Sequence, residues 1–222
     1  MGESAKLFEA IQSGDENAVR ALLGADSSLA AAKNERGQSA VLMAAYTGRT
    51  AIRDLLLAQD PRLELHEAAA AGQFGRVKQI VGADPSREKE YSPDGFPLLA
   101  LAAVFGHQEI AEYLFRNGAD ANAVATNGTG YTALTGTATN GQTPIVVWLL
   151  QNGANPNHRY GPGYTPLMAA AAGGHLETVK VLLRHGADLS LAANDGKTAA
   201  DLAEARGHRE VAEFLKGRAA TA

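Results

Sequence analysis

The chain has 222 residues, of which 45% are hydrophobic and 20% are charged, and its formal net charge is -4. This is the composition of an ordinary folded protein, and a weakly acidic chain without a polybasic run argues against a dedicated binder of nucleic acid or anionic lipid. Cysteine is absent, which excludes disulfides, thiolate catalysis and cysteine metal sites.

The first predicted element is a helix pair within residues 4–33, with the sequence AKLFEAIQSGDENAVRALLG. Gly14 is expected to end its first helix, because glycine tolerates the left-handed conformation found at helix C-termini. This segment mixes charged residues with a narrow apolar stripe and lacks a Thr-Pro start. We therefore predict that it caps a repeat array, whose terminal repeats need a polar outer face.

Further glycines repeat this helix-ending position along the chain: Gly14, Gly48, Gly72, Gly106, Gly141, Gly174 and Gly207. Successive intervals are 34, 24, 34, 35, 33 and 33 residues, and a fixed period of this size is typical of repeat proteins. The spacing predicts about seven helix-turn-helix repeats, at residues 4–33, 34–62, 63–91, 92–122, 123–157, 158–190 and 191–218. Residues 219–222 are expected to form a disordered tail.

The one short interval indicates a duplication. A shift of 58 residues places LFEAIQSGD on LHEAAAAGQ, and Gly24-Ala25-Asp26 on Gly82-Ala83-Asp84. We infer that a block of two repeats was duplicated in tandem. Because LAQDPRLELHEAAAAG has no Asp-Gly turn, we expect the protruding hairpin to be missing between the second and third repeats.

The clearest repeat is YTPLMAAAAGGHLETVKVLLRHGADLS, residues 164–190. Thr165 followed by Pro166 suits an N-cap and the first helical position. Gly174 is expected to end this helix, and a second helix is predicted over about 176–185. The last copy, TAADLAEARGHREVAEFLKG, carries many charges and is predicted to be the second cap.

The repeat at 164–190 resembles the ankyrin pattern T-P-L-H-x-A-A-x-x-G-H followed by an apolar helix and G-A-D. Residues 96–122 and 131–157 are further copies, and the resemblance covers nearly the whole chain. The duplicated block is also similar to stand-alone bacterial ankyrin proteins that begin LFEAA…G…V…LL…DPSL. The resemblance implies an all-α ankyrin-repeat solenoid with short β-hairpin loops and terminal caps. It also implies a single intracellular domain, over residues 1–218, that binds another protein.

Residues with possible chemistry have simpler structural explanations. Four histidines occupy scaffold positions of the repeat: His66, His107, His175 and His208. No H-E-x-x-H metal spacing or G-x-S-x-G nucleophile context occurs, and the glycine-rich NGTGYT lacks the spacing of a P-loop. Asn127-Gly128 instead suits a type I′ hairpin turn. We therefore predict no enzymatic activity, no cofactor and no metal site.

The resemblance also indicates where a partner binds. In ankyrin repeats the residues before the Thr-Pro step and before the helix-ending glycine face the concave surface, and here these slots include Thr139, Ala172, Gly173 and Arg206. The residues predicted to bind a partner, in these slots and in the neighbouring hairpins, are Tyr46, Tyr91, Phe96, Phe105, Tyr131, Tyr160, Tyr164 and Lys197. Phe96, Tyr131 and Tyr164 hold the same slot in consecutive repeats. Aromatic residues of this kind anchor many interfaces, but the rings can equally pack within the solenoid, and both interpretations stay open.

The resulting hypothesis is a cytoplasmic protein-binding scaffold or regulatory module, monomeric on its own, that binds neither nucleic acid nor membrane. No apolar stretch approaches the roughly 20 residues that span a bilayer. Two alternatives remain: a small-molecule or enzymatic role in a pocket between hairpins, and a self-associating structural array.

Overall fold

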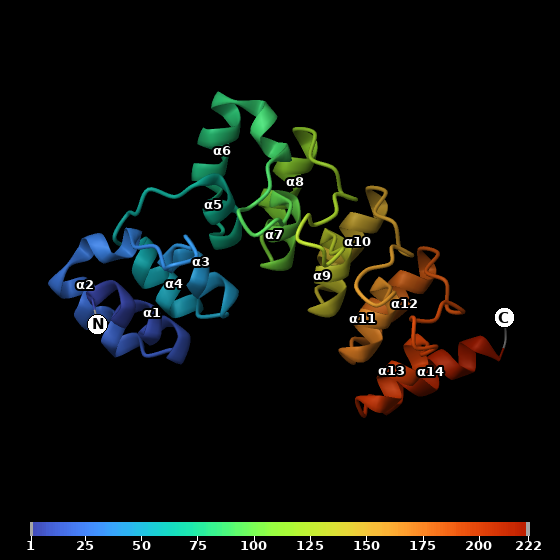
Figure 1. Ribbon diagram of the computed structural model, residues 1–222. Coiled ribbons are helices and arrows are strands. Elements are labelled where there is room, and N and C mark those ends of the chain that lie inside the picture. The colour runs from blue at the N-terminus through green and yellow to red at the C-terminus, as the bar shows by residue number, and fades with distance from the viewer. Residues whose placement is uncertain (1, 221–222) are drawn as a thin grey trace. The chain divides into compact units, whose positions relative to one another are not determined.

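The computed structural model describes residues 2–220, which are mainly helical. Fourteen α-helices in this range follow one another in seven pairs, which fits the seven expected repeats (Figure 1). The chain divides into two compact units, residues 1–82 and 83–222. Of the expected tail, Ala219 is the last residue of the final helix, and residues 221–222 lie outside the described part.

Unit 1 holds the first three helix pairs. Their helices are α1 (Glu3–Ser13), α2 (Glu16–Ala25), α3 (Ala40–Tyr46), α4 (Thr50–Leu57), α5 (Leu65–Ala71) and α6 (Phe74–Ala83), with the 3₁₀-helix η1 (Ser27–Ala31) between α2 and α3. The first helices form one row, in which α3 packs against both α1 and α5, while α2 packs against α4. Leu7, Leu56 and Leu65 are almost completely buried between these rows.

Unit 2 holds the remaining four pairs. They are α7 (Leu98–Val104) with α8 (Gln108–Arg116), α9 (Ala133–Thr139) with α10 (Thr143–Gln151), α11 (Pro166–Ala172) with α12 (Leu176–Arg184), and α13 (Ala199–Ala205) with α14 (Arg209–Ala219), preceded by the 3₁₀-helix η2 (Pro85–Lys89). Within this unit α7, α9, α11 and α13 pack in one row, and α10, α12 and α14 pack in a second row behind it. Each helix pair therefore buries its apolar face against its sequence neighbours, as a solenoid requires.

Threonine and glycine set the ends of the first helices. The Thr165 hydroxyl accepts a hydrogen bond from the Met168 backbone N–H, and Pro166 occupies the first turn, so the predicted N-cap is confirmed. Thr132 and Thr198 cap α9 and α13 in the same way. At the other end, Gly174 has φ 73°, a left-handed conformation that side chains other than glycine rarely adopt.

Short hairpins join most of the repeats and are closed by a single β-bridge, except the one at residues 125–131, which is closed by a hydrogen bond from Ala125 N–H to the Tyr131 carbonyl at 2.8 Å. Four bridges occur in residues 2–220, at Lys33–Ser39, Tyr91–Pro97, Tyr160–Tyr164 and Ala192–Thr198. The described segment 58–64 has neither a bridge nor a backbone hydrogen bond across it, so the expected loss of a hairpin between the second and third repeats is confirmed.

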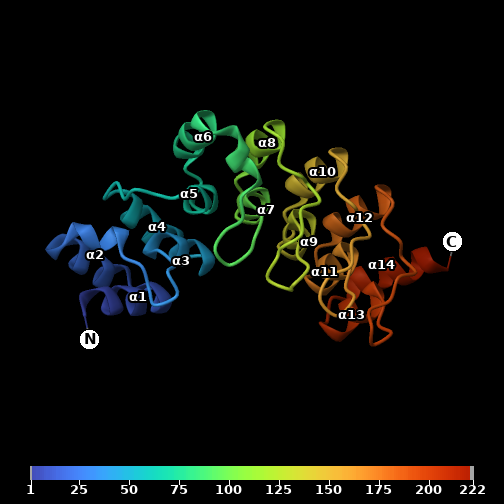
Figure 2. The ribbon, with the colours of Figure 1, turned by 45° about the horizontal axis from the view of Figure 1, so that its top comes forward.

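Hydrogen bonds link the tips of consecutive hairpins in unit 2. Thr126 N–H donates to the Gly95 carbonyl at 2.8 Å, and Gly161 N–H donates to the Thr129 carbonyl at 3.0 Å. Figure 2 shows these loops following one another along the first helices of the unit. Each hairpin is therefore held in place by the hairpin before it.

The expected type I′ turn at Asn127-Gly128 is wrong. Gly128 has φ 81°, but Asn127 is not among the residues with positive φ, as that turn would need. Asn127 instead accepts a hydrogen bond from the Thr129 hydroxyl at 2.6 Å and donates one from Nδ2 to the Asp94 carbonyl at 2.9 Å. Its side chain stabilises the loop and joins it to the preceding one.

Asparagine side chains form a second link between repeats, which we call the asparagine ladder. Asn122 Nδ2 donates to the Gly153 carbonyl, and Asn122 Oδ1 accepts from the Asn155 backbone N–H, both at 2.8 Å. Asn157 makes the same two contacts one repeat later, with Gly186 at 3.0 Å and Asp188 at 2.8 Å.

Close packing of the first helices depends on small residues. Gly136 lies in the middle of α9, where an added Cβ would collide with Cγ2 of Val104 at the end of α7. His175 also joins two repeats, with its Nε2 3.0 Å from the Thr139 carbonyl oxygen, in keeping with its predicted scaffold role. No helix within residues 2–220 is long and apolar enough to cross a membrane.

Candidate functional site

The site is built on three tyrosines held by two consecutive hairpins. Tyr131 and Tyr164 each precede the capping threonine of a first helix, in α9 and α11. Because the cap fixes how the chain enters the helix, the two side chains occupy equivalent places in their repeats. Tyr160 lies across the β-bridge from Tyr164, which brings a third ring to the same surface.

The three rings contact one another with Tyr160 in the centre. The centroids of Tyr131 and Tyr160 are 4.9 Å apart with a tilt of 48°, and those of Tyr160 and Tyr164 are 6.2 Å apart at 71°. Tilted and edge-on arrangements at these separations are the favoured ones for aromatic pairs. Tyr160 is only 8% exposed, whereas Tyr131 and Tyr164 are half-buried and keep part of their rings accessible.

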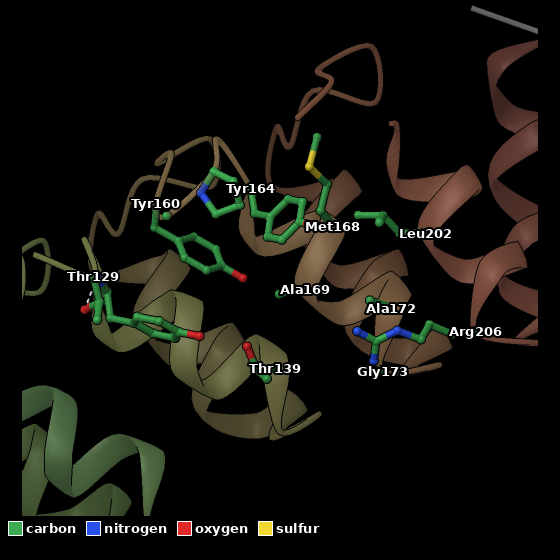
Figure 3. A pocket seen from close by; sticks show the side chains of 13 residues that line it. Thr129, Thr139, Tyr160, Tyr164, Met168, Ala169, Ala172, Gly173, Leu202 and Arg206 are labelled. Atoms are coloured by element: carbon green, nitrogen blue, oxygen red, sulfur yellow. Dashed lines mark hydrogen bonds between the residues drawn. The ribbon is translucent and has the colours of Figure 1, made fainter. Parts of the chain in front are cut away.

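A groove with a volume of about 520 Å³ runs along these rings. We call it the tyrosine groove and define it by Tyr131, Tyr160, Tyr164, Met168, Leu202 and Arg206. Ala169, Ala172 and Gly173 of the α11 region complete its lining with small side chains, and Figure 3 shows Arg206 beyond them, away from the rings. The groove therefore combines aromatic rings, an apolar lining and one cation, contributed by three consecutive repeats.

Two electrostatic features mark the groove. Burial raises the pKa of Tyr160 to about 12, the neighbouring Tyr131 adds to the rise, and a hydrogen bond with Thr139 opposes it, so this hydroxyl stays protonated at neutral pH. Arg206 is exposed, and no salt bridge joins it to a carboxylate within residues 2–220. Its guanidinium is therefore available to a carboxylate of a ligand.

The structure separates the other residues that were predicted to bind a partner. Tyr91 lines a different groove, and Lys197 pairs with Asp195 at 2.8 Å without lining the tyrosine groove. Phe96 and Phe105 are half-buried residues near the two ends of α7, and neither lines the groove. Tyr46 belongs to unit 1, at the end of α3.

Some groove residues could be found from sequence and some could not. Thr139, Ala172, Gly173 and Arg206 hold slots that the repeat pattern assigns to the concave face, and all four line the groove. Met168 and Leu202 were not predicted. They lie within first helices, at positions that the repeat pattern does not mark.

The groove offers contacts for binding rather than an arrangement of reacting groups. Its polar groups are hydroxyls and one guanidinium, which can hold a ligand through hydrogen bonds and charge. Across residues 2–220, no three His, Asp or Glu side chains gather in a way that could hold a metal ion.

Comparison with protein families gives one match. The family model for ankyrin repeats (3 copies) matches residues 65–160 and 137–221, which together make up more than half of the chain. The matched region begins at α5 and includes every residue of the tyrosine groove. No curated protein matches the chain.

Proposed function

Because the chain belongs to the ankyrin-repeat family, whose repeats are generally protein–protein interaction modules, we propose that the tyrosine groove binds a segment of another protein. The observation that carries this proposal is the set of three contacting tyrosines beside an apolar lining that leads to Arg206. Tyrosines contribute large contact areas at a low cost in side-chain entropy, and they are frequent interface hot spots.

The groove also favours one kind of partner segment. Apolar side chains of the partner fit against the exposed parts of Tyr131 and Tyr164, and a carboxylate fits opposite the unpaired Arg206. Tyr160 has a different role, because its ring is almost fully buried between the other two. Packing within the solenoid and binding of a partner are thus compatible. The Tyr160 ring packs inside the protein and supports the other two rings, which stay accessible to a partner.

Paired substitutions test the groove. We expect the Tyr131→Ala, Tyr164→Ala double variant to lose partners that the unmodified protein captures from its source cells. Each lost hot-spot ring typically lowers affinity by at least about 2 kcal/mol, and the loss is measured by calorimetric titration with a captured partner. Arg206→Ala should weaken binding further and remove part of its dependence on salt.

Tyr113→Ala is the matched control, because it removes a half-buried tyrosine from the second helix α8 rather than from the groove. It should retain every partner. If the double variant is folded by circular dichroism and still binds with unchanged affinity, the groove is not the binding site.

A small-molecule role is the second candidate, because a volume of about 520 Å³ lies within the range of ligand pockets. Such a ligand would be aromatic or apolar with an anionic group for Arg206. A thermal-shift screen of metabolites distinguishes the two roles, since specific binding raises the unfolding temperature. A metabolite that stabilises the unmodified protein but not the Tyr131→Ala, Tyr164→Ala variant would favour a small-molecule ligand over a protein partner.

We further propose that the protein acts without catalysis, as a monomer in the cytoplasm. Ankyrin-repeat proteins are typically non-enzymatic scaffolds, and the absence of cysteine fits a reducing compartment. A light-scattering mass that rises with concentration would favour the self-associating array instead.

A further inference from the structure

A second groove in unit 2 lies between residues 88–91 and 119–124 and has a volume of about 490 Å³. It shares no lining residue with the tyrosine groove. We propose that this second groove, the Glu88 groove, binds a lysine or arginine side chain of a partner protein.

Glu88 is the first reason. Its side chain is only 4% exposed, and within the described residues its Oε2 atom is buried without a hydrogen-bond partner. Buried carboxylate oxygens are normally satisfied, because desolvating them otherwise costs free energy. The duplicated block holds Ala30 at the equivalent position, where the side chain is 2% exposed. A carboxylate is therefore not required at this position of the repeat, and Glu88 lines the groove, where its negative charge would favour a bound cation.

The charge of the groove favours a cation. Three carboxylates line it, those of Glu88, Glu90 and Asp120, and Lys89 is the single lining cation. Glu90 is already paired with Arg87 at 2.6 Å, which leaves Glu88 and Asp120 as the carboxylates that favour a cation. Lys89 Nζ is 3.9 Å from Glu88 Oε1, and the lysine side chain is 71% exposed. Such a weak, solvated pair can be displaced at little cost, so Lys89 does not satisfy Glu88 firmly.

The walls of the groove favour an organic cation with an aliphatic stem. Tyr91 is 41% exposed and Val124 is 39% exposed, and both line this groove. The methylene groups of a lysine or arginine pack well on such apolar surface while the charged head reaches a carboxylate. A tyrosine ring additionally attracts a cation placed over its face.

The Glu88 side of the groove lies in the repeat just before the asparagine ladder begins. Ser86 stands at the position that Asn122 and Asn157 hold in later repeats, and its hydroxyl donates to Asp84 at 2.6 Å within its own repeat. Glu88 instead approaches the next repeat, where a Cβ on Gly118 would lie 3.4 Å from Oε1. Beside the glycine of the next repeat, this repeat thus places the carboxylate of Glu88, whereas the later repeats place the neutral amide of an asparagine there.

Binding of short peptides to the full chain tests this proposal. The probes are acetyl-Gly-Lys-Gly-amide and its norleucine analogue, which keeps the stem without the charge, titrated by two-dimensional ¹⁵N NMR. We expect the lysine peptide, and not the norleucine peptide, to shift the amide resonances of residues 88–91 and 119–124. Glu88→Gln should weaken this binding at least tenfold, and Tyr91→Ala should weaken it several-fold.

Glu177→Gln is the matched control, since it removes the same charge from an exposed residue of α12 that pairs with Lys180. It should bind the lysine peptide like the unmodified chain, as should the Tyr131→Ala, Tyr164→Ala variant. Equal binding of the norleucine peptide, or unchanged affinity in Glu88→Gln and Tyr91→Ala, would overturn the proposal. The same resonance shifts produced by calcium chloride alone, with no response to the lysine peptide, would assign the groove to a metal ion instead.

Discussion

At the scale of single residues, the central ring of the tyrosine groove links stability to pH. Tyr160 is almost fully buried, and its pKa is raised from 10.0 to about 12. The neutral hydroxyl is therefore favoured in the folded chain, and the stability that it contributes is complete below pH 10. As the pH rises from 10 to 12, the unfolded chain releases this proton while the folded chain retains it, so the free energy of unfolding falls.

We expect Tyr160 to account for a loss of about 2–3 kcal/mol between pH 10 and pH 12, because each pKa unit corresponds to about 1.4 kcal/mol. Denaturant unfolding of the native chain and of Tyr160→Phe, measured across this range, isolates the contribution. Tyr160→Phe should show the smaller loss, and the difference in absorbance at 295 nm should place the ionisation of Tyr160 near pH 12. An identical fall in both proteins would show that this hydroxyl is not responsible.

At the scale of elements, the helices follow closely from sequence, whereas the shape of the groove does not. Thr165, Pro166 and Gly174 set the helix ends where local rules place them. The rules are sufficient because capping and left-handed glycines depend on a few neighbouring residues. The expectation that failed is the turn at Asn127, whose side chain donates a hydrogen bond to the Asp94 carbonyl of the preceding repeat. No local pattern encodes such a contact between repeats, nor the placement of Phe96 outside the tyrosine groove.

Packing between first helices gives a prediction for α9. Gly136→Ala would normally favour a helix by roughly 1 kcal/mol, but the new methyl group collides with Val104 of α7. We expect a net loss of about 1–3 kcal/mol from overpacking, measured by denaturant unfolding.

Val104→Ala is the partner substitution for a double-mutant cycle. In the Val104→Ala background, Gly136→Ala should be neutral or stabilising, because the methyl group then occupies vacated space. If the effects of the two substitutions on the free energy of unfolding are additive, α7 and α9 are not in contact through Val104 and Gly136.

At the scale of the whole molecule, each repeat in unit 2 packs mainly on the repeats before and after it. Stability in such an array is approximately a sum of repeat and nearest-neighbour terms. A substitution that destabilises the last repeat should therefore also destabilise the repeats before it, by an amount that decreases with distance from the last repeat.

Leu215 in α14 is fully buried, and Leu215→Ala should cost about 2–5 kcal/mol. Hydrogen exchange should accelerate most in α13 and α14, less in α11 and α12, and least in α7 and α8. A uniform acceleration through residues 83–220 would instead mean that this unit unfolds as one cooperative block. Glu213→Ala, an exposed change in the same helix, serves as the control and should leave exchange unchanged.

The asparagine ladder has a consequence for how such a chain can diversify. Asn122 and Asn157 bind carbonyl and N–H groups of the following repeat, and every amino acid except proline carries both groups. These hydrogen bonds therefore do not depend on the side chains of the following repeat. Neighbouring repeats can be mutated, duplicated or exchanged without losing the hydrogen bonds between them. Selection is left free to alter the surface residues that choose a binding partner.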